Sequence, residues 1–153
     1  RSDASAEYAA VKADIPQFQG GITILVLEAH ELLAPPPAAP RPVAKLLWLC
    51  TRRADVPAEG LKARWLQSPP EALRQVPGLR RCVQNFVVDR SHPVHAGVPA
   101  GDAAAVETLT EMWFDDVNAL RAAFRSEAGQ RAIHGDPLLA PFAAYRIDEV
   151  HII

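Results

Sequence analysis

The order of strand-like and helix-like segments across residues 45–153 constrains the fold of this chain more than any other feature. A nearly continuous apolar run, Lys45–Thr51, predicts a central strand buried on both faces. Leu79–Asp89 is rich in β-favouring side chains and predicts a second strand. Val106–Phe114 alternates between two faces and predicts a third, while Tyr145–Ile153 is expected to be the last.

Two helical regions separate these strands. The first is opened by Pro57 and must stop before Pro69, and the second is capped by Asp115 or Asp116 and continues in a further piece over 126–135. The order β-α-β-β-α-β predicts an α+β, ferredoxin-like domain with a four-stranded antiparallel sheet. Right-handed crossovers put both helical regions on one face, so the other face must be buried against something.

Proline divides the chain into a short and a long part. Residues 34–43 form a proline-rich linker between a helix plus strand in 1–33 and the main domain, 44–153. The strand of the short part ends in Glu28-Ala29-His30, and the long part ends similarly in Glu149-Val150-His151. Two explanations stay open: the first part is the remnant of a first tandem copy, or the repeat is coincidental.

Composition narrows the classes of function. The 153 residues are 49% hydrophobic with a formal net charge of −2 and no basic stripe, which argues against nucleic-acid binding. No apolar run is long enough to span a bilayer, so no membrane partner is expected. Cys50 and Cys82 lack metal-binding or redox spacing and predict free, buried thiols in a cytoplasmic protein.

Four sequence stretches together carry a resemblance to a known family. They are Arg64-Trp65-Leu66, Val76–Asn85 (VPGLRRCVQN), Glu111–Phe114 (EMWF) and Glu149-Val150-His151. With these stretches the chain resembles the EthD family of the dimeric α/β-barrel superfamily. The resemblance implies two sheets that pack face to face, in a homodimer or in an intramolecular pseudo-dimer, around a pocket for a small hydrophobic or aromatic molecule. It also implies cofactor-independent chemistry of the cyclase, lyase or oxygenase kind.

The chain departs from that family at positions that matter for chemistry. The family commonly has a histidine four residues beyond its helical tryptophan, where this chain has Pro69, and tyrosines where this chain has Arg64 and Cys82. These departures put the acid–base chemistry of the family in doubt for this chain.

Five residues are candidates for a site. Glu111 lies in an apolar strand beside Trp113 and is the candidate catalytic acid or base, although a salt bridge to Arg80 or Arg81 is the favoured alternative. The candidate ligand-binding residues, for which packing or cross-strand hydrogen bonding is the alternative, are Trp48, Arg81, Asn85 and Trp113.

The histidines give a weaker signal. His92 and His95 are spaced as metal ligands are, but no third ligand is evident, so no metal site is predicted. His134 fits a helix C-terminus, and His30 and His151 fit strand ends. The function expected is therefore binding of a small hydrophobic molecule, with or without turnover; the alternative is a non-catalytic binding or assembly module with a degenerate pocket.

Overall fold

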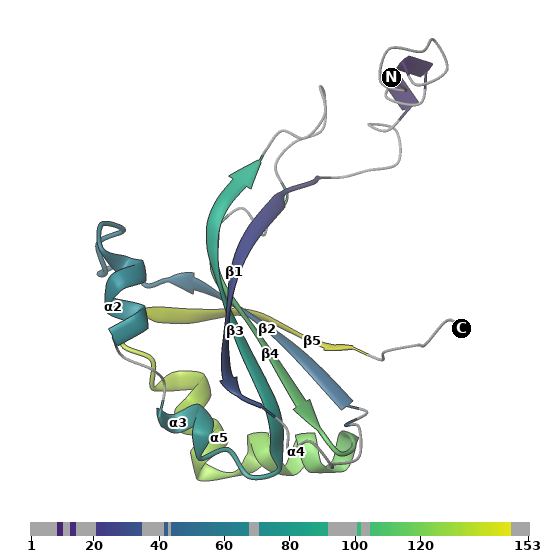
Figure 1. Cartoon of the computed structure of the whole chain (residues 1–153), viewed down its shortest axis with the longest axis vertical. Coiled ribbons are helices and arrows are strands. Elements are labelled where there is room, and N and C mark those ends of the chain that lie inside the picture. Colours follow the sequence, from purple (N-terminus) through teal and green to yellow (C-terminus); the bar gives the residue numbers. More distant parts are fainter. Residues whose placement is uncertain are drawn as a thin grey trace. The chain divides into compact units, whose positions relative to one another are not determined.

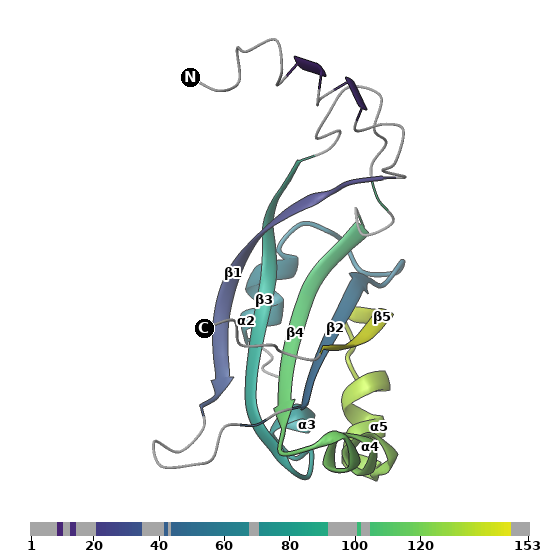
Figure 2. The same ribbon diagram turned by 90° about the vertical axis from the view of Figure 1, so that its right-hand side faces the viewer.

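The computed structural model describes residues 9–10, 13–14, 21–34, 42, 44–67, 71–91, 101 and 105–147. The strands form one antiparallel sheet in the order β1-β3-β4-β2-β5 (Figures 1 and 2). Their bounds are β1 Ile24–Leu33, β2 Ala44–Arg52, β3 Leu79–Ser91, β4 Val106–Phe114 and β5 Leu139–Ile147. The helices are α2 Leu61–Gln67, α3 Glu71–Arg74, α4 Val117–Arg125 and α5 Glu127–His134.

The prediction of a four-stranded ferredoxin-like sheet is wrong, because the sheet has five strands. The added strand is β1, which lies before the proline-rich segment and occupies the edge beside β3. A strand at an edge leaves a row of unpaired backbone donors and acceptors, and β1 satisfies that row on β3. Sequence periodicity shows that a segment is extended but not which edge it joins.

The predicted last strand is also displaced. β5 is Leu139–Ile147 rather than Tyr145–Ile153, and the residues after 147 lie outside the described part of the chain. Pro141 pairs with Cys50 at a register shift of the β2–β5 ladder. Proline lacks a donor and is confined to edge strands and bulges, so its presence obscured a strand that does extend through it.

The boundaries of α4 and α5 follow the capping signals in the sequence, whereas α2 begins at Leu61 and not at Pro57 as predicted. Asp116 is the N-cap of α4, as predicted, and its Oδ1 accepts a hydrogen bond of 2.8 Å from the backbone N–H of Ala119. Ser126 ends α4 and starts α5, because its hydroxyl accepts a hydrogen bond of 3.0 Å from the N–H of Gly129. The turn before β3 uses Gly78 at φ +72°, a backbone conformation that glycine adopts without strain.

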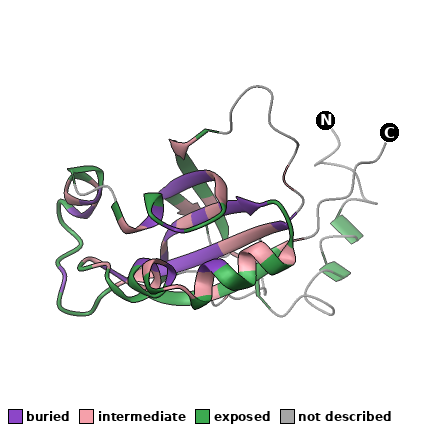
Figure 3. Cartoon of the chain, turned by 90° about the horizontal axis from the view of Figure 1, so that it is seen from below, coloured by how far each residue is buried: buried purple, intermediate pink, exposed green. Residues whose placement is uncertain are grey.

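The hydrophobic core lies between the helices and one face of the sheet. It is built from alternate residues of the strands together with helix residues such as Trp65, Leu73 and Ala123. Met112 and Phe114 are fully buried at its centre. The helices therefore show buried inner and exposed outer surfaces (Figure 3), and both cysteine thiols are free and buried, as expected.

The chain divides into two compact units. One comprises Arg1–Leu27 and Val87–Ala105; in its described part, the N–H of Gly101 donates a 3.0 Å hydrogen bond to Thr23 Oγ1. The other comprises Glu28–Phe86 and Val106–Ile153, and it holds all the residues of the sites below. Within the described residues, no helix combines the length and the apolar character needed to cross a bilayer.

Candidate functional site

Four of the five predicted site residues lie together on the sheet face opposite the core. The β3–β4 ladder places Arg81 beside Trp113, and Asn85 lies four residues further along β3, near Glu111. The alternation of β4 points Glu111 and Trp113 to the same side. The structure thus brings the four together, while their roles in ligand binding or catalysis stay predictions.

Glu111 is held by two neighbours. Its Oε2 lies 2.6 Å from Lys45 Nζ on β2, and its Oε1 accepts a 3.2 Å hydrogen bond from the amide of Asn85 on β3. Glu111 thus forms a salt bridge with Lys45, and the predicted partners Arg80 and Arg81 were wrong. Arg80 instead pairs with Asp115 at 3.4 Å and Arg81 with Glu31 at 3.1 Å. Both oxygens of Glu111 are engaged, which favours a structural ion pair over an acid or base waiting for a substrate.

Two cations lie close to the ring of Trp113. Lys45 Nζ and the Arg81 guanidinium carbon each lie 4.7 Å from the centre of its ring system. Cations over an indole face are attracted by its quadrupole, and the two stems also shield the ring from water. These contacts occupy ring surface that a planar ligand would use.

Trp48, the fifth predicted residue, lies on the other face of the sheet. Its side chain belongs to the core, so it does not share a site with Glu111. It instead lines two hollows between the sheet and the helices, one small and polar and one larger and apolar.

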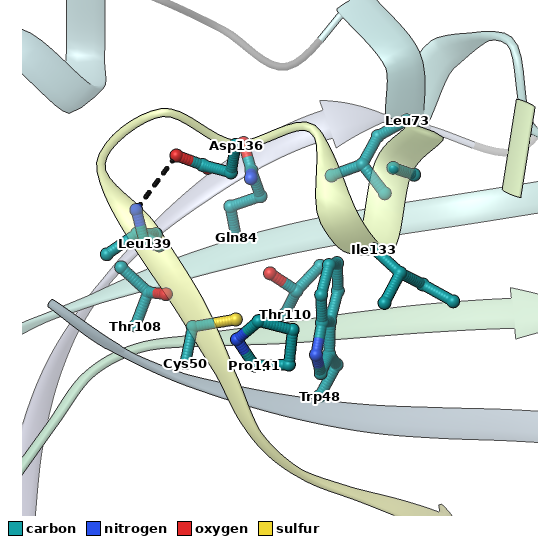
Figure 4. Close-up of a pocket in the computed structure, with 11 residues that line it drawn as sticks. Trp48, Cys50, Leu73, Gln84, Thr108, Thr110, Ile133, Asp136, Leu139 and Pro141 are labelled. Carbon is teal, nitrogen blue, oxygen red and sulfur yellow. Dashed lines mark hydrogen bonds between the residues drawn. The ribbon is translucent and has the colours of Figure 1, made fainter. Parts of the chain in front are cut away.

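The small hollow lies among the residues in Figure 4 and has a cavity volume of about 20 Å³, enough for about one water molecule. Asp136, in its wall, accepts hydrogen bonds from the N–H groups of Leu138 (2.7 Å) and Leu139 (3.0 Å). Burial, and then the charge of Asp136, raises the pKa of the Cys50 thiol to about 12. The carboxylate is engaged and the thiol stays protonated near neutral pH, so this hollow does not contain an activated nucleophile.

The larger hollow is a groove between α4, α5 and β5, with a cavity volume of about 580 Å³. Its wall is almost entirely apolar, with Leu46, Trp48, Leu120, Phe124, Ile133 and Phe142. Two charged residues, Arg121 and Arg125, complete the lining from α4. They are one helical turn apart, both are exposed, and neither forms an ion pair with another described residue.

The sequence reasoning missed the residues of this groove other than Trp48. Arg121 and Arg125 are four residues apart on a helix, a signal that was available in the sequence. Phe142 lies in the segment before the predicted last strand, so its strand position could not be anticipated. His92, His95 and His151 lie outside the described residues, and His134 ends α5 as expected.

Comparisons with known proteins add a structural likeness. No protein-family profile matches the sequence, and no curated protein matches it either. The chain resembles the crystal structure of an EthD-family protein from Bacillus halodurans C-125, with 20% sequence identity, a TM-score of 0.48, and coverage of 71% of this chain and 99% of that chain. A likeness of this degree assigns neither a family nor an activity to the chain, so the resemblance seen in the sequence stays a prediction.

Proposed function

We propose that this protein binds a small molecule with an apolar, aromatic-sized body and one negative charge, in the groove between α4, α5 and β5. The observation that carries the proposal is an apolar groove of about 580 Å³ whose wall holds two arginines that form no ion pair with a described residue. Its volume falls within the roughly 300–1,000 Å³ of small-molecule sites, which combine an apolar lining with a few polar groups.

The groove chemistry favours binding over turnover. Among the lining residues that the structure describes, there is no carboxylate, thiol or imidazole that could transfer a proton. Trp48 and Phe124 offer aromatic surface to the body of the ligand, and an arginine fork suits a carboxylate or sulfonate. The catalytic prediction for Glu111 concerns the opposite face of the sheet and has no support from this groove.

The proposal is tested by calorimetric titration with 2-naphthoate and with its uncharged counterpart 2-naphthamide. We expect saturable 1:1 binding of 2-naphthoate and weaker binding of the amide. The double variant Arg121→Gln/Arg125→Gln should lose most of this preference, because a charge-assisted hydrogen bond contributes about 1.5–3 kcal/mol. The matched control is Arg53→Gln, an exposed arginine that pairs with Asp55 away from the groove. Equal binding of acid and amide by the unaltered protein would contradict the proposal.

A second copy of the chain is the partner we propose for the sheet face opposite the helices. The described helices pack on the other face, and this one carries two acids and two bases, Glu31, Arg81, Lys45 and Glu111. Such a balanced pattern suits a two-fold interface, where one surface must complement itself. Sedimentation equilibrium tests this proposal, and we expect a dimer. A protein that stays monomeric at every concentration would contradict it. Pairing within a longer tandem chain stays a prediction.

A further inference from the structure

The added strand β1 places a histidine against the tryptophan of α2. The rings of His30 and Trp65 lie edge to face, with centroids 5.6 Å apart. The ring of Trp65 in turn packs against that of Phe86 on β3, with centroids 5.4 Å apart. Trp65 is 4% exposed, so the histidine packs beside the edge of the hydrophobic core. A fully apolar side chain would fill this position without the cost of placing a polar ring there.

The surroundings of His30 are charged but balanced. One oxygen of Glu28 lies 3.0 Å from Nε2 of His30, and the other lies 2.6 Å from Nζ of Lys62 on α2. Nε2 is buried, and its contact with Glu28 does not have hydrogen-bond alignment. The neighbouring Glu31 is paired with Arg81. Glu28 and Glu31 are thus each paired with a basic side chain. The cluster therefore favours neither a cationic nor an anionic ligand.

These side chains border a pocket of about 190 Å³. Its lining includes His30, Leu32, Trp65, Leu66 and Gln84, none of which lines the groove between α4 and β5. Gln84 is 8% exposed and also lines the small hollow of Figure 4. The buried polar atom of this lining that has no hydrogen-bond partner among the described residues is Nε2 of His30. A buried polar atom without a partner costs about 1–3 kcal/mol, so its presence here points to an occupant that completes its hydrogen bonding.

We infer that this pocket is a second binding site, selective for a neutral, hydroxylated single-ring aromatic molecule. The volume lies below the roughly 300 Å³ at which drug-sized sites begin, which limits the occupant to about one ring. Trp65 and Leu66 contact the ring, and the hydroxyl bonds to the imidazole of His30 and the amide of Gln84. An imidazole and an amide can each donate or accept a hydrogen bond, so both match a hydroxyl group. The inference does not depend on the ligand of the larger groove.

The test is an NMR titration of the full chain with phenol, with toluene as the probe of equal size that lacks the hydroxyl. The indole N–H of Trp65 is the reporter. We expect phenol to shift this signal in a saturable way and to bind about three- to tenfold more tightly than toluene, the factor that one net hydrogen bond gives. His30→Leu and Gln84→Leu should each remove that difference while leaving toluene binding in place.

The control is His134→Leu, which removes an exposed histidine at the end of α5 and should change neither affinity. His30 lies on an edge strand and is partly exposed, so His30→Leu decides the question even where Gln84→Leu disturbs folding. Equal affinities for phenol and toluene in the unaltered protein would overturn the inference. So would unchanged phenol binding in His30→Leu, or a Trp65 signal that does not move with either probe.

Discussion

Removing the charge of Glu111 should destabilise the protein, because the ion pair between Glu111 and Lys45 is lost. The two side chains are 24% and 17% exposed and lie 2.6 Å apart, on neighbouring strands of the sheet. Glu111→Gln keeps an oxygen that can accept the hydrogen bond of Asn85, so it isolates the charge. Lys45→Met keeps the apolar stem of the lysine while removing the ammonium group.

The burial of the pair sets the size of the effect. Exposed ion pairs contribute about 0.2–1 kcal/mol, whereas removing one partner of a fully buried pair costs about 3–5 kcal/mol. The Lys45–Glu111 pair lies between these limits, so we expect a coupling free energy of about 1–2 kcal/mol. Loss of the lysine–indole contact at Trp113 affects Lys45→Met and the double variant alike, so the double-mutant cycle subtracts it.

The assay is urea unfolding of the unaltered protein, both single variants and the double variant. The matched control is the exposed pair Arg131–Glu127, four residues apart on α5, which should show a coupling of about 0.3–0.5 kcal/mol. A coupling no larger than that of the control would refute the view that Glu111 is a structural ion pair. That result would favour the prediction that Glu111 is catalytic.

Three further predictions concern a helix cap, the two buried cysteines and a closely packed glycine. Asp116→Ala removes the N-cap of α4 and should cost about 1 kcal/mol of unfolding free energy, measured by urea unfolding. Burial raises the pKa of both Cys50 and Cys82 to about 12, so they should react slowly with a disulfide reagent at pH 8. Because the unfolded thiols ionise first, stability should fall by about 1.4 kcal/mol per pH unit for each cysteine from about pH 9 toward pH 12. Gly129→Ala would place a Cβ in a steric clash with the carbonyl oxygen of Ala123, and thermal unfolding should show a loss of about 3 kcal/mol or more.

Each of these predictions has its own control. Asp115→Ala removes a carboxylate that caps no helix, so a loss equal to that of Asp116→Ala would contradict the capping account. The cysteine account fails if both thiols react as fast in the folded protein as in urea. For Gly129, the comparison is Gly101→Ala, whose new Cβ would meet nothing closer than 3.5 Å. Similar stabilities of these two glycine variants would contradict the packing argument.

Local signals in the sequence predicted the central strands and the helix caps. The alternation of Val106–Phe114 placed Glu111 and Trp113 on one face, and the structure agrees. The same reasoning could not place Trp48, because Lys45–Thr51 is apolar on both faces and its pattern does not show which residues point to the helices. The helical crossovers decide that, and they depend on the whole chain.

Non-local pairing explains the remaining differences. The pairing of β1 with β3 joins segments about 50 residues apart, and no periodicity within β1 reveals its partner. The cation of Glu111 is Lys45 because the register of β2 against β4 sets it diagonally opposite, which depends on ladder register rather than on sequence distance. The apolar groove combines α4, α5 and β5, so it could not be read from one segment.

The most direct test of the proposed function is calorimetric titration of 2-naphthoate into the variant Ala144→Phe, whose new ring would fill the groove beside Trp48. The matched control is Ala29→Phe, at an exposed position of β1 away from the groove. We expect Ala144→Phe to weaken binding at least tenfold and Ala29→Phe to leave it unchanged. Equal affinity in both variants would contradict the account, because it would place the bound molecule somewhere other than this groove.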